Sequence, residues 1–401
     1  MPEAVIVATG RTPIGRANKG SLVECRPDDL SALVLRSVLE QVPQLNPAEV
    51  EDVLLGCGQP AGEAGYNIAR VAALLAGLEN APGVTVNRYC SSSLQTIRMA
   101  AHAIRAGEGD VFIAAGVETV SRYSHGASDI GPHNTAFAVA EERTALRAPA
   151  VTEPWAPQEG LPDVYIAMGQ TAENVAEYEK VTREEMDEFA LLSQTRAVES
   201  QQNGFFEREI IPVTLPDGTV VTKDDGPRAG TTLEGLSNLK PVFREGGTIT
   251  AGNACPLNDG AAAVIVMSDT KAKALGITPL ARIVASGVTG LNPEIMGLGP
   301  VDACRQVLAR ADMKIDDIDL VEINEAFAAQ VIPSAKHLGI SWDKLNTRGG
   351  AIALGHPFGQ TGARIMTTLL NALEDSGKTF GLESMCVGGG QGMAMIVERL
   401  S

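Results

Sequence analysis

The chain has 401 residues, of which 49 are acidic and 32 are basic, so its formal net charge at neutral pH is −17. An acidic chain of globular composition (44% apolar, 20% charged residues) without clusters of Lys and Arg is a poor candidate for binding nucleic acids or acidic membranes. Six cysteines without a CxxC pair argue against a disulfide scaffold or a zinc site.

Short apolar segments alternate with helical patterns along the chain. Segment 4–10 (AVIVATG) predicts a strand, segment 28–42 a helix, and segments 50–56 and 109–118 two further strands. This order, with Gly-rich exits from the strands, is typical of an α/β fold whose sheet is covered by helices on both faces. At about 150 residues per domain, the length corresponds to two or three folding units.

An internal repeat indicates that the α/β unit is duplicated. AVIVATGRT at 4–12 matches ARIVASGVT at 281–289 in six of nine positions. Segment 49–56 is likewise similar to segment 318–323, and the last segment, from 384 to 400, predicts two strands joined by a glycine turn.

The first copy carries an insertion. Its predicted strands end near Glu118, but the next apolar strand begins only at Gly260, so roughly 130 residues must form a substructure of their own. We expect irregular structure over 123–162, helix over 172–202 and loops up to 250. The predicted domains are an N-terminal half (1–120 with 249–275), an inserted domain (121–248) and a C-terminal half (276–401).

Cys90 stands at the start of a predicted helix. In VNRYCSSSLQTIRMAAHAIRAG, apolar Leu94, Ile97, Ala101 and Ile104 recur at helical spacing behind it. The free N–H groups and the positive end of the helix dipole would lower the pKa of the thiol and favour a nucleophilic thiolate. The alternative is a small buried side chain of the core.

His356 occupies the equivalent position in the second copy, 266 residues further on. It lies in GGAIALGHPFGQTGAR, where Pro357 suits the first turn of a following helix and the glycines would let the backbone approach a ligand. Two equivalent helix starts that face each other would bring the thiol of Cys90 and this imidazole together. The alternative is a structural histidine.

Two more candidate sites follow predicted strands. Cys386 precedes three consecutive glycines, whose N–H groups are suited to an oxyanion hole; the alternative is a core cysteine in a tight hairpin. Asn324 and Glu325 follow the strand LVEI, at the strand end where α/β sheets bind ligands. Asn324 would also suit a helix N-cap.

Together these segments resemble the thiolase family (acetyl-CoA acetyltransferases and 3-ketoacyl-CoA thiolases) over essentially the whole chain. The matching blocks are NRYCSSS, TAGNACPLNDGAA, INEAFAAQ, GGAIALGHPFGQTGAR and CVGGGQG, in the family's order and spacing. The resemblance implies duplicated α/β halves stacked in layers, α-β-α-β-α, with an inserted loop domain that binds CoA and substrate. It implies CoA-dependent thiolysis of 3-ketoacyl-CoA to acetyl-CoA and a shortened acyl-CoA, or the reverse Claisen condensation.

The resemblance also assigns roles. Cys90 would carry the acyl group as a thioester, and His356 would activate Cys90 and donate to the thioester oxygen of the bound acyl-CoA. Cys386 would remove or return the α-proton. Asn324 would hold a water that completes one oxyanion hole with His356, and the N–H groups of Cys90 and Gly388 would form the second. No metal or cofactor is implied, since CoA is a substrate.

Along the substrate, the resemblance places Arg228 near the nucleotide end of CoA and Met168, Phe243 and Phe327 along the acyl or pantetheine tunnel. The alternatives are a solvated charge for the arginine and core packing for the other three.

The block that contains Ala254 and Cys255 would lie near the pantetheine. Many thiolases have a serine where this chain has Cys255 followed by Pro256. A thiol is a weaker hydrogen-bond partner than a hydroxyl, so the family's substrate contacts are in doubt at this position.

Other functions stay open on the same residues. A decarboxylating condensing enzyme of the same superfold would have a histidine at the position of Cys386, and a Cys–His hydrolase leaves that cysteine unexplained. A noncatalytic acyl-CoA or lipid-binding protein would not need Cys90, Asn324, His356 and Cys386 together.

The sequence also suggests an oligomeric state and a cellular location. The resemblance implies a homodimer or homotetramer. Because the first residues lack a basic segment and no apolar run approaches the roughly 18 residues of a membrane span, we expect a cytoplasmic protein.

Overall fold

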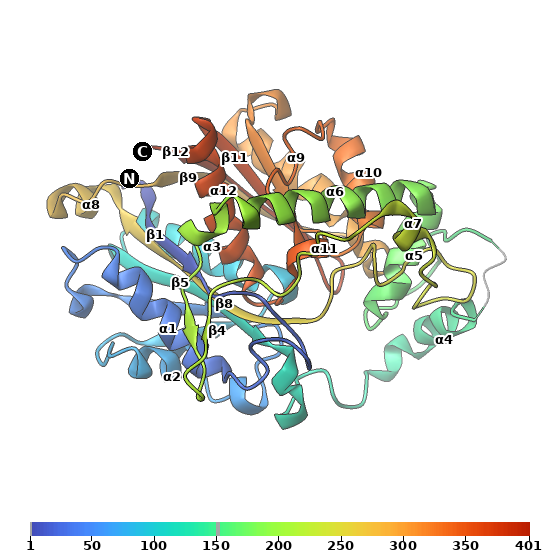
Figure 1. The fold of residues 1–401 in the computed structure, drawn as a ribbon, viewed down its shortest axis with the longest axis horizontal. Helices are drawn as coiled ribbons and strands as arrows, with labels where there is room; N and C mark the ends of the chain where they lie inside the picture. The colour runs from blue at the N-terminus through green and yellow to red at the C-terminus, as the bar shows by residue number, and fades with distance from the viewer. Residues whose placement is uncertain (1, 150–152) are drawn as a thin grey trace.

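The structure, a computed structural model, describes residues 2–149 and 153–401. Through these residues runs a ten-stranded mixed sheet (Figure 1), in the order β10-β11-β12-β9-β1-β8-β5-β3-β4, with β2 paired to β8. The strands are β1 (Ala4–Arg11), β2 (Gly15–Arg16), β3 (Asp52–Gly56), β4 (Gly83–Val86), β5 (Val111–Thr119), β8 (Asn258–Ser268), β9 (Ala281–Gly290), β10 (Leu320–Ile323), β11 (Phe380–Val387) and β12 (Gln391–Arg399).

The centre of the sheet shows the duplication. Strands β1 and β9, which carry the two similar sequence segments, lie side by side and antiparallel, paired at Val5–Arg282 and Ile6–Ala281. Moving outward, β8, β5 and β3 in one half correspond to β12, β11 and β10 in the other, and β3–β5 and β10–β11 are parallel. The predicted duplicated α/β fold is confirmed. The two halves also join into one sheet through this short contact.

Helices and sheet halves alternate in layers. Helices α3 and α12 lie between the halves and share one apolar core with β5, β8, β11 and β12, while α1 and α2 cover the outer face of the first half and α9 and α10 that of the second. The α-β-α-β-α order is therefore confirmed. The bounds of these helices, with two short ones, are α1 (Pro27–Glu40), α2 (Ile68–Leu75), α3 (Ser92–Ala106), α8 (Asp269–Leu275), α9 (Gly299–Ala311), α10 (Ala328–Leu338), α11 (Ala351–Leu354) and α12 (Thr361–Ser376).

The two central helices touch at their N-terminal ends. A β-carbon on Gly362 of α12 would lie 2.3 Å from the main-chain nitrogen of Leu94 in α3, so this approach requires glycine. The hydroxyl of Ser93 accepts a hydrogen bond from the N–H of Ala363 at 2.9 Å. The two helix starts that the repeat makes equivalent are thus held against each other.

The inserted segment contains more helix than the sequence pattern predicts. Helix α4 lies in the stretch expected to be irregular; it is mostly exposed and buries only Ala140. The helix expected over 172–202 is two helices, separated at Lys180, whose φ of 55° ends α5. The elements are α4 (Ala138–Arg147), α5 (Met168–Glu179), α6 (Arg183–Gln202), β6 (Val213–Thr214), β7 (Val220–Val221) and α7 (Leu233–Ser237). Among the described helices, none has the length and apolar content to cross a membrane.

Buried charges lie where the two halves meet the insertion. Arg11 is fully buried and pairs with Glu209 and Asp224, each at 2.7 Å. Nearby, Arg364 and Glu322 are also almost completely buried. Burial raises the pKa of Glu322 to about 8, against the opposing effect of the Arg364 charge.

This raised pKa predicts a pH-dependent stability. Between the ordinary glutamate pKa and about 8, the unfolded chain loses a proton that the folded chain keeps, so the free energy of unfolding falls as pH rises, by roughly 1 kcal/mol per pH unit. Replacing Glu322 with Gln keeps the neutral form and should flatten this slope. Urea unfolding midpoints at pH 5.5 to 8.5 measure it; equal slopes for both proteins would refute the assignment.

Candidate active site

Cys90 lies in a one-turn 3-10 helix (Tyr89–Ser91) directly before α3, and its exposed fraction is 8%. Its own N–H and that of Gly388 donate hydrogen bonds to its sulfur. These bonds favour the thiolate, but burial outweighs them and the negative charge of Glu118 adds to burial, so that the pKa of Cys90 rises to about 11. The expectation of a lowered thiol pKa is therefore wrong: a helix start does not compensate for removal from water. Cys90 needs a base to become a nucleophile.

Two other thiols lie close to Cys90. Cys386 ends strand β11 in front of the glycine turn and is fully buried. Cys255 lies in the loop before β8 and is partly exposed. Burial raises the pKa of both thiols. The charge of a Cys90 thiolate would raise both pKa values further, so the three sulfurs are close enough to interact electrostatically.

His356 is held as a neutral base. Its exposed fraction is 1%, and burial, followed by the charge of Arg364, lowers its pKa to about 3. The Thr361 hydroxyl donates to the carbonyl of Pro357 (2.8 Å), so its oxygen accepts from Nδ1–H of His356 (2.6 Å). This assigns the proton to Nδ1 and leaves the lone pair on Nε2, 3.3 Å from Nδ2 of Asn324.

The structure corrects two local predictions around His356 and Asn324. Helix α12 begins at Thr361 rather than at Pro357, so His356 sits in a loop five residues before the helix. Asn324 is not an N-cap, because α10 begins at Ala328. Instead its N–H donates to the carbonyl of Ser384 (2.9 Å), two residues before the second buried thiol.

Thr361 is a residue that sequence reasoning missed. We expect Thr361→Val to lower kcat about 10-fold, because the buried Nδ1–H of His356 loses its acceptor and the tautomer is no longer fixed. Steady-state thiolysis of acetoacetyl-CoA measures this effect. Thr361→Ser keeps the hydroxyl and should retain most of the activity; an equal loss in both variants would contradict the tautomer argument.

The predicted tunnel residues form one apolar group. The rings of Phe243 and Phe327 meet edge to face with centroids 6.2 Å apart, and Ala254 forms a β-bridge with Phe327. Phe243 also covers Gly169, the neighbour of Met168. Phe327 and Ala254 are buried, whereas Met168 (38%) and Phe243 (41%) are exposed.

Arg228 is anchored to the insertion. Its N–H donates to the side chain of Gln194 on α6 at 2.9 Å. Partial burial and the neighbouring charge of Arg16 lower the pKa of its guanidinium. Sequence reasoning did not single out Arg16, although two adjacent cations are suited to a phosphate.

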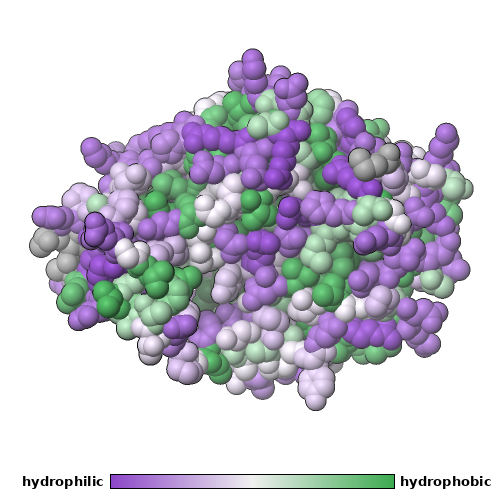
Figure 2. Space-filling view, turned by 180° about the vertical axis from the view of Figure 1, so that it is seen from behind, coloured by the Kyte–Doolittle hydropathy of each residue, from purple (hydrophilic) through white to green (hydrophobic). Residues whose placement is uncertain are grey.

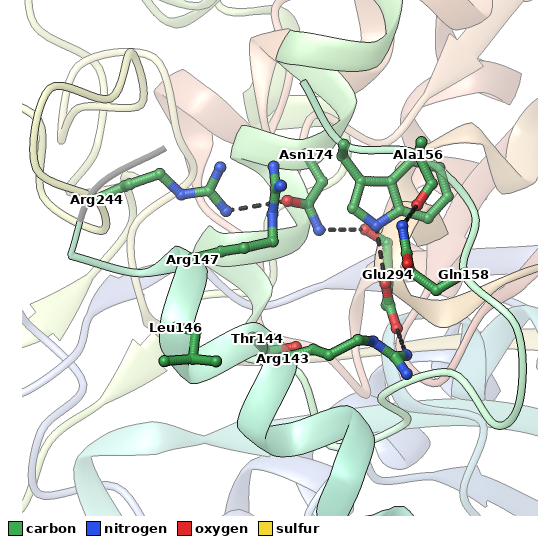
Figure 3. A pocket seen from close by; sticks show the side chains of 10 residues that line it. Arg143, Thr144, Leu146, Arg147, Ala156, Gln158, Asn174, Arg244 and Glu294 are labelled. Carbon is green, nitrogen blue, oxygen red and sulfur yellow. Dashed lines mark hydrogen bonds and ion pairs between the residues drawn. The ribbon is translucent and has the colours of Figure 1, made fainter. Parts of the chain in front are cut away.

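A separate cavity of about 230 Å³ lies between the insertion and the 3-10 helix at 293–298 (Figure 3). In it, Arg143 of α4 pairs with Glu294 (3.1 Å), which also accepts from the indole N–H of Trp155 (2.8 Å). Asn174 of α5 accepts from Arg244 (3.0 Å) and donates to the carbonyl of Glu294 (3.0 Å). None of the predicted site residues lines this cavity; its hydrogen bonds fasten α4 to α5 and to the 3-10 helix at 293–298.

Comparison with known proteins identifies the family. The model of the thiolase N-terminal domain matches residues 4–270 and that of the thiolase C-terminal domain residues 277–399. Full-length relatives include a beta-ketoadipyl-CoA thiolase of Acinetobacter baylyi (44% identical), a 3-oxoadipyl-CoA/3-oxo-5,6-dehydrosuberyl-CoA thiolase of Escherichia coli (46%) and a probable acetyl-CoA acyltransferase of Staphylococcus aureus (42%), each covered over 100% of both chains.

A solved structure agrees with these matches. The crystal structure of the Bacillus anthracis acetyl-CoA acetyltransferase superimposes with a TM-score of 0.86 and 40% identity, over 100% of this chain and 99% of that one. The sequence blocks, the layered fold and these full-length relatives agree, and the chain belongs to the thiolase family.

Proposed function

We propose that this thiolase acts through an acyl-enzyme on Cys90. The observation that carries the proposal is the surroundings of the Cys90 sulfur, which accepts hydrogen bonds from its own N–H and that of Gly388 and has Cys386 nearby. Neutral His356, with its lone pair on Nε2, takes the thiol proton. The thiolate then attacks the 3-keto carbon, whose oxygen becomes negative between the two N–H donors.

The thiol of Cys386 transfers the proton to and from the α-carbon of acetyl-CoA. When the C2–C3 bond breaks, its electron pair leaves as the enolate of acetyl-CoA, and we assign Cys386 to protonate that carbon. The thiolate of Cys386 then takes the proton of an incoming CoA thiol, whose sulfur attacks the thioester and releases the shortened acyl-CoA. Cys90 leaves as a thiolate and takes its proton back from the protonated His356. His356 and a water held by Asn324 stabilise the enolate oxygen, so the cycle needs CoA as a substrate and no further cofactor.

We propose that residues of the insertion and its neighbours bind CoA. Arg228 and Arg16 form a cationic pair for phosphate groups of CoA, and Phe243, Phe327 and Met168 form the apolar wall beside the acyl or pantetheine chain. Ala254 and Cys255 adjoin this wall, because Ala254 forms a β-bridge with Phe327 and the Cys255 N–H donates to the carbonyl of Ala326 (3.0 Å).

The experiment is CoA-dependent loss of the enolate absorbance of 3-ketoacyl-CoA. Acetoacetyl-CoA, a long straight-chain analogue, an α-methyl analogue and 3-oxoadipyl-CoA cover short, long, branched and dicarboxylic chains, the last because relatives are named for it. Turnover with any of them supports acyl-CoA C-acyltransferase activity, and acetoacetyl-CoA turnover supports C-acetyltransferase activity. No turnover, together with no acyl group on Cys90 by intact mass, would leave the noncatalytic acyl-CoA-binding function.

The assembly we propose is a homodimer or homotetramer in the cytoplasm. Figure 2 shows an apolar patch over the α4 region, where Ile130 (76% exposed), Val139 (71%) and Leu146 (72%) are uncovered. Strand β4 is also an edge of the sheet. Both features suit contact with a second copy, and light scattering measures the mass.

A further inference from the structure

We propose that Glu118 is a positioning residue, which fixes the His356 loop against the helix that carries Cys90. The inference rests on the roles proposed for Cys90 and His356. Glu118 lies near the end of β5, and its exposed fraction is 1%. No step of the mechanism above uses it.

The carboxylate of Glu118 gathers donors from three separate parts of the chain. One oxygen accepts from the N–H of Gly58, in the loop after β3, and from the N–H of Gly359, in the His356 loop, at 2.8 and 2.9 Å. The other oxygen accepts from the N–H of Gln59 (3.1 Å) and the hydroxyl of Tyr123 (2.9 Å). A single carboxylate thus joins the first half, the start of the insertion and the second half.

The bond to Gly359 holds the loop where α3 also packs. A β-carbon on Gly116, two residues before Glu118, would lie 1.9 Å from the carbonyl oxygen of Gly359 and 2.6 Å from the β-carbon of Ser93 in α3. The His356 loop and the start of α3 therefore both pack against Gly116 of β5. Between Gly359 and the imidazole, Phe358 packs edge to face on His356 with centroids 5.2 Å apart. A displaced Gly359 would move His356 relative to Cys90.

Glu118 also influences Cys90 through its charge. The groups that face the carboxylate are the four donors above and the thiol of Cys57, 3.8 Å away. None of these carries a positive charge, so the carboxylate is compensated by hydrogen bonds alone. Its charge raises the pKa of Cys90, in the same direction as burial. Glu118 thereby adds to the burial that keeps Cys90 protonated.

The test compares Glu118→Gln with Tyr123→Phe. Glutamine has nearly the same shape but lacks the charge and replaces one acceptor oxygen by a donor, so one of the two pairs of donors loses its partner. We expect kcat for acetoacetyl-CoA thiolysis to fall by about 10- to 100-fold with little change in KM. We also expect iodoacetamide to alkylate Cys90 at least about threefold faster at pH 8, because the pKa of its thiol falls. Tyr123→Phe removes one donor and keeps the charge, so its alkylation profile should match the wild type.

Two further variants separate positioning from general stability. Glu118→Asp keeps the charge but shortens the reach; it should lower kcat and leave the pH profile of Cys90 alkylation unchanged. Glu173→Gln is the matched control, because Glu173 is equally buried and accepts from the N–H groups of Thr248 and Ile249. If Glu118→Gln lowers kcat no more than Glu173→Gln does and leaves the alkylation profile unmoved, the proposal is overturned. Failure of the proposed function would instead appear in the wild type, as absence of acylation on Cys90.

Discussion

A Cys90→Ser variant should lose at least about 10³-fold in kcat and form no detectable acyl-enzyme. A serine hydroxyl is far less acidic than a thiol, and Cys90 is already buried with a pKa of about 11, so neutral His356 cannot generate the corresponding alkoxide. Intact mass after incubation with acetyl-CoA measures acylation directly. Acylation of the serine variant at the wild-type rate would refute Cys90 as the nucleophile.

The matched control for this experiment is Cys25→Ser. Cys25 has 9% of its surface exposed, and its pKa is likewise raised to about 11, mainly by burial. It belongs to the core on the outer face of the first half rather than to the group of three thiols. This variant should acylate and turn over as the wild type does, so that a loss seen only at Cys90 reports on position and not on thiol content.

Replacing Cys386 with Ala should separate the two half-reactions. The variant should still take an acetyl group from acetyl-CoA onto Cys90, because the nucleophile, His356 and the N–H of Gly388 remain. Thiolysis of acetoacetyl-CoA should fall by about 10³-fold, because no group is left to protonate the carbanion inside a site where Cys386 is fully buried. Intact mass follows the first step and enolate absorbance the second. Wild-type thiolysis by the variant would refute the assignment of Cys386.

The sequence predicted the duplicated α/β fold because the two halves still share similar segments. Six identities between segments 4–12 and 281–289 indicated the duplication, and the apolar run of β8 marked where the interrupted half resumes. Helix α4 was missed because it has only ten residues, half of which are polar. The break at Lys180 depends on one left-handed residue that is not glycine, which composition does not reveal.

The candidate site was predictable in its residues but not in its electrostatics. The position of Cys90 followed from a helix start, but His356 lies in the loop before α12, and the pKa of Cys90 depends on burial and on Glu118, a residue near the end of another strand. Glu118 left only a weak signal, a charged residue behind an apolar strand. No sequence pattern pointed to Thr361, because its hydrogen bond to His356 depends on the conformation of the loop before α12.

The contact of the two halves along β1 and β9 has an evolutionary meaning. Two copies of an ancestral half, paired about a twofold axis, would have presented identical residues at both helix starts. Fusion into one polypeptide removed that constraint, so that one copy could specialise in forming the covalent bond and the other in moving protons. In the proposed mechanism Cys90 comes from the first half and His356, Asn324 and Cys386 from the second, an asymmetry that an obligatory pair of identical chains could not have acquired.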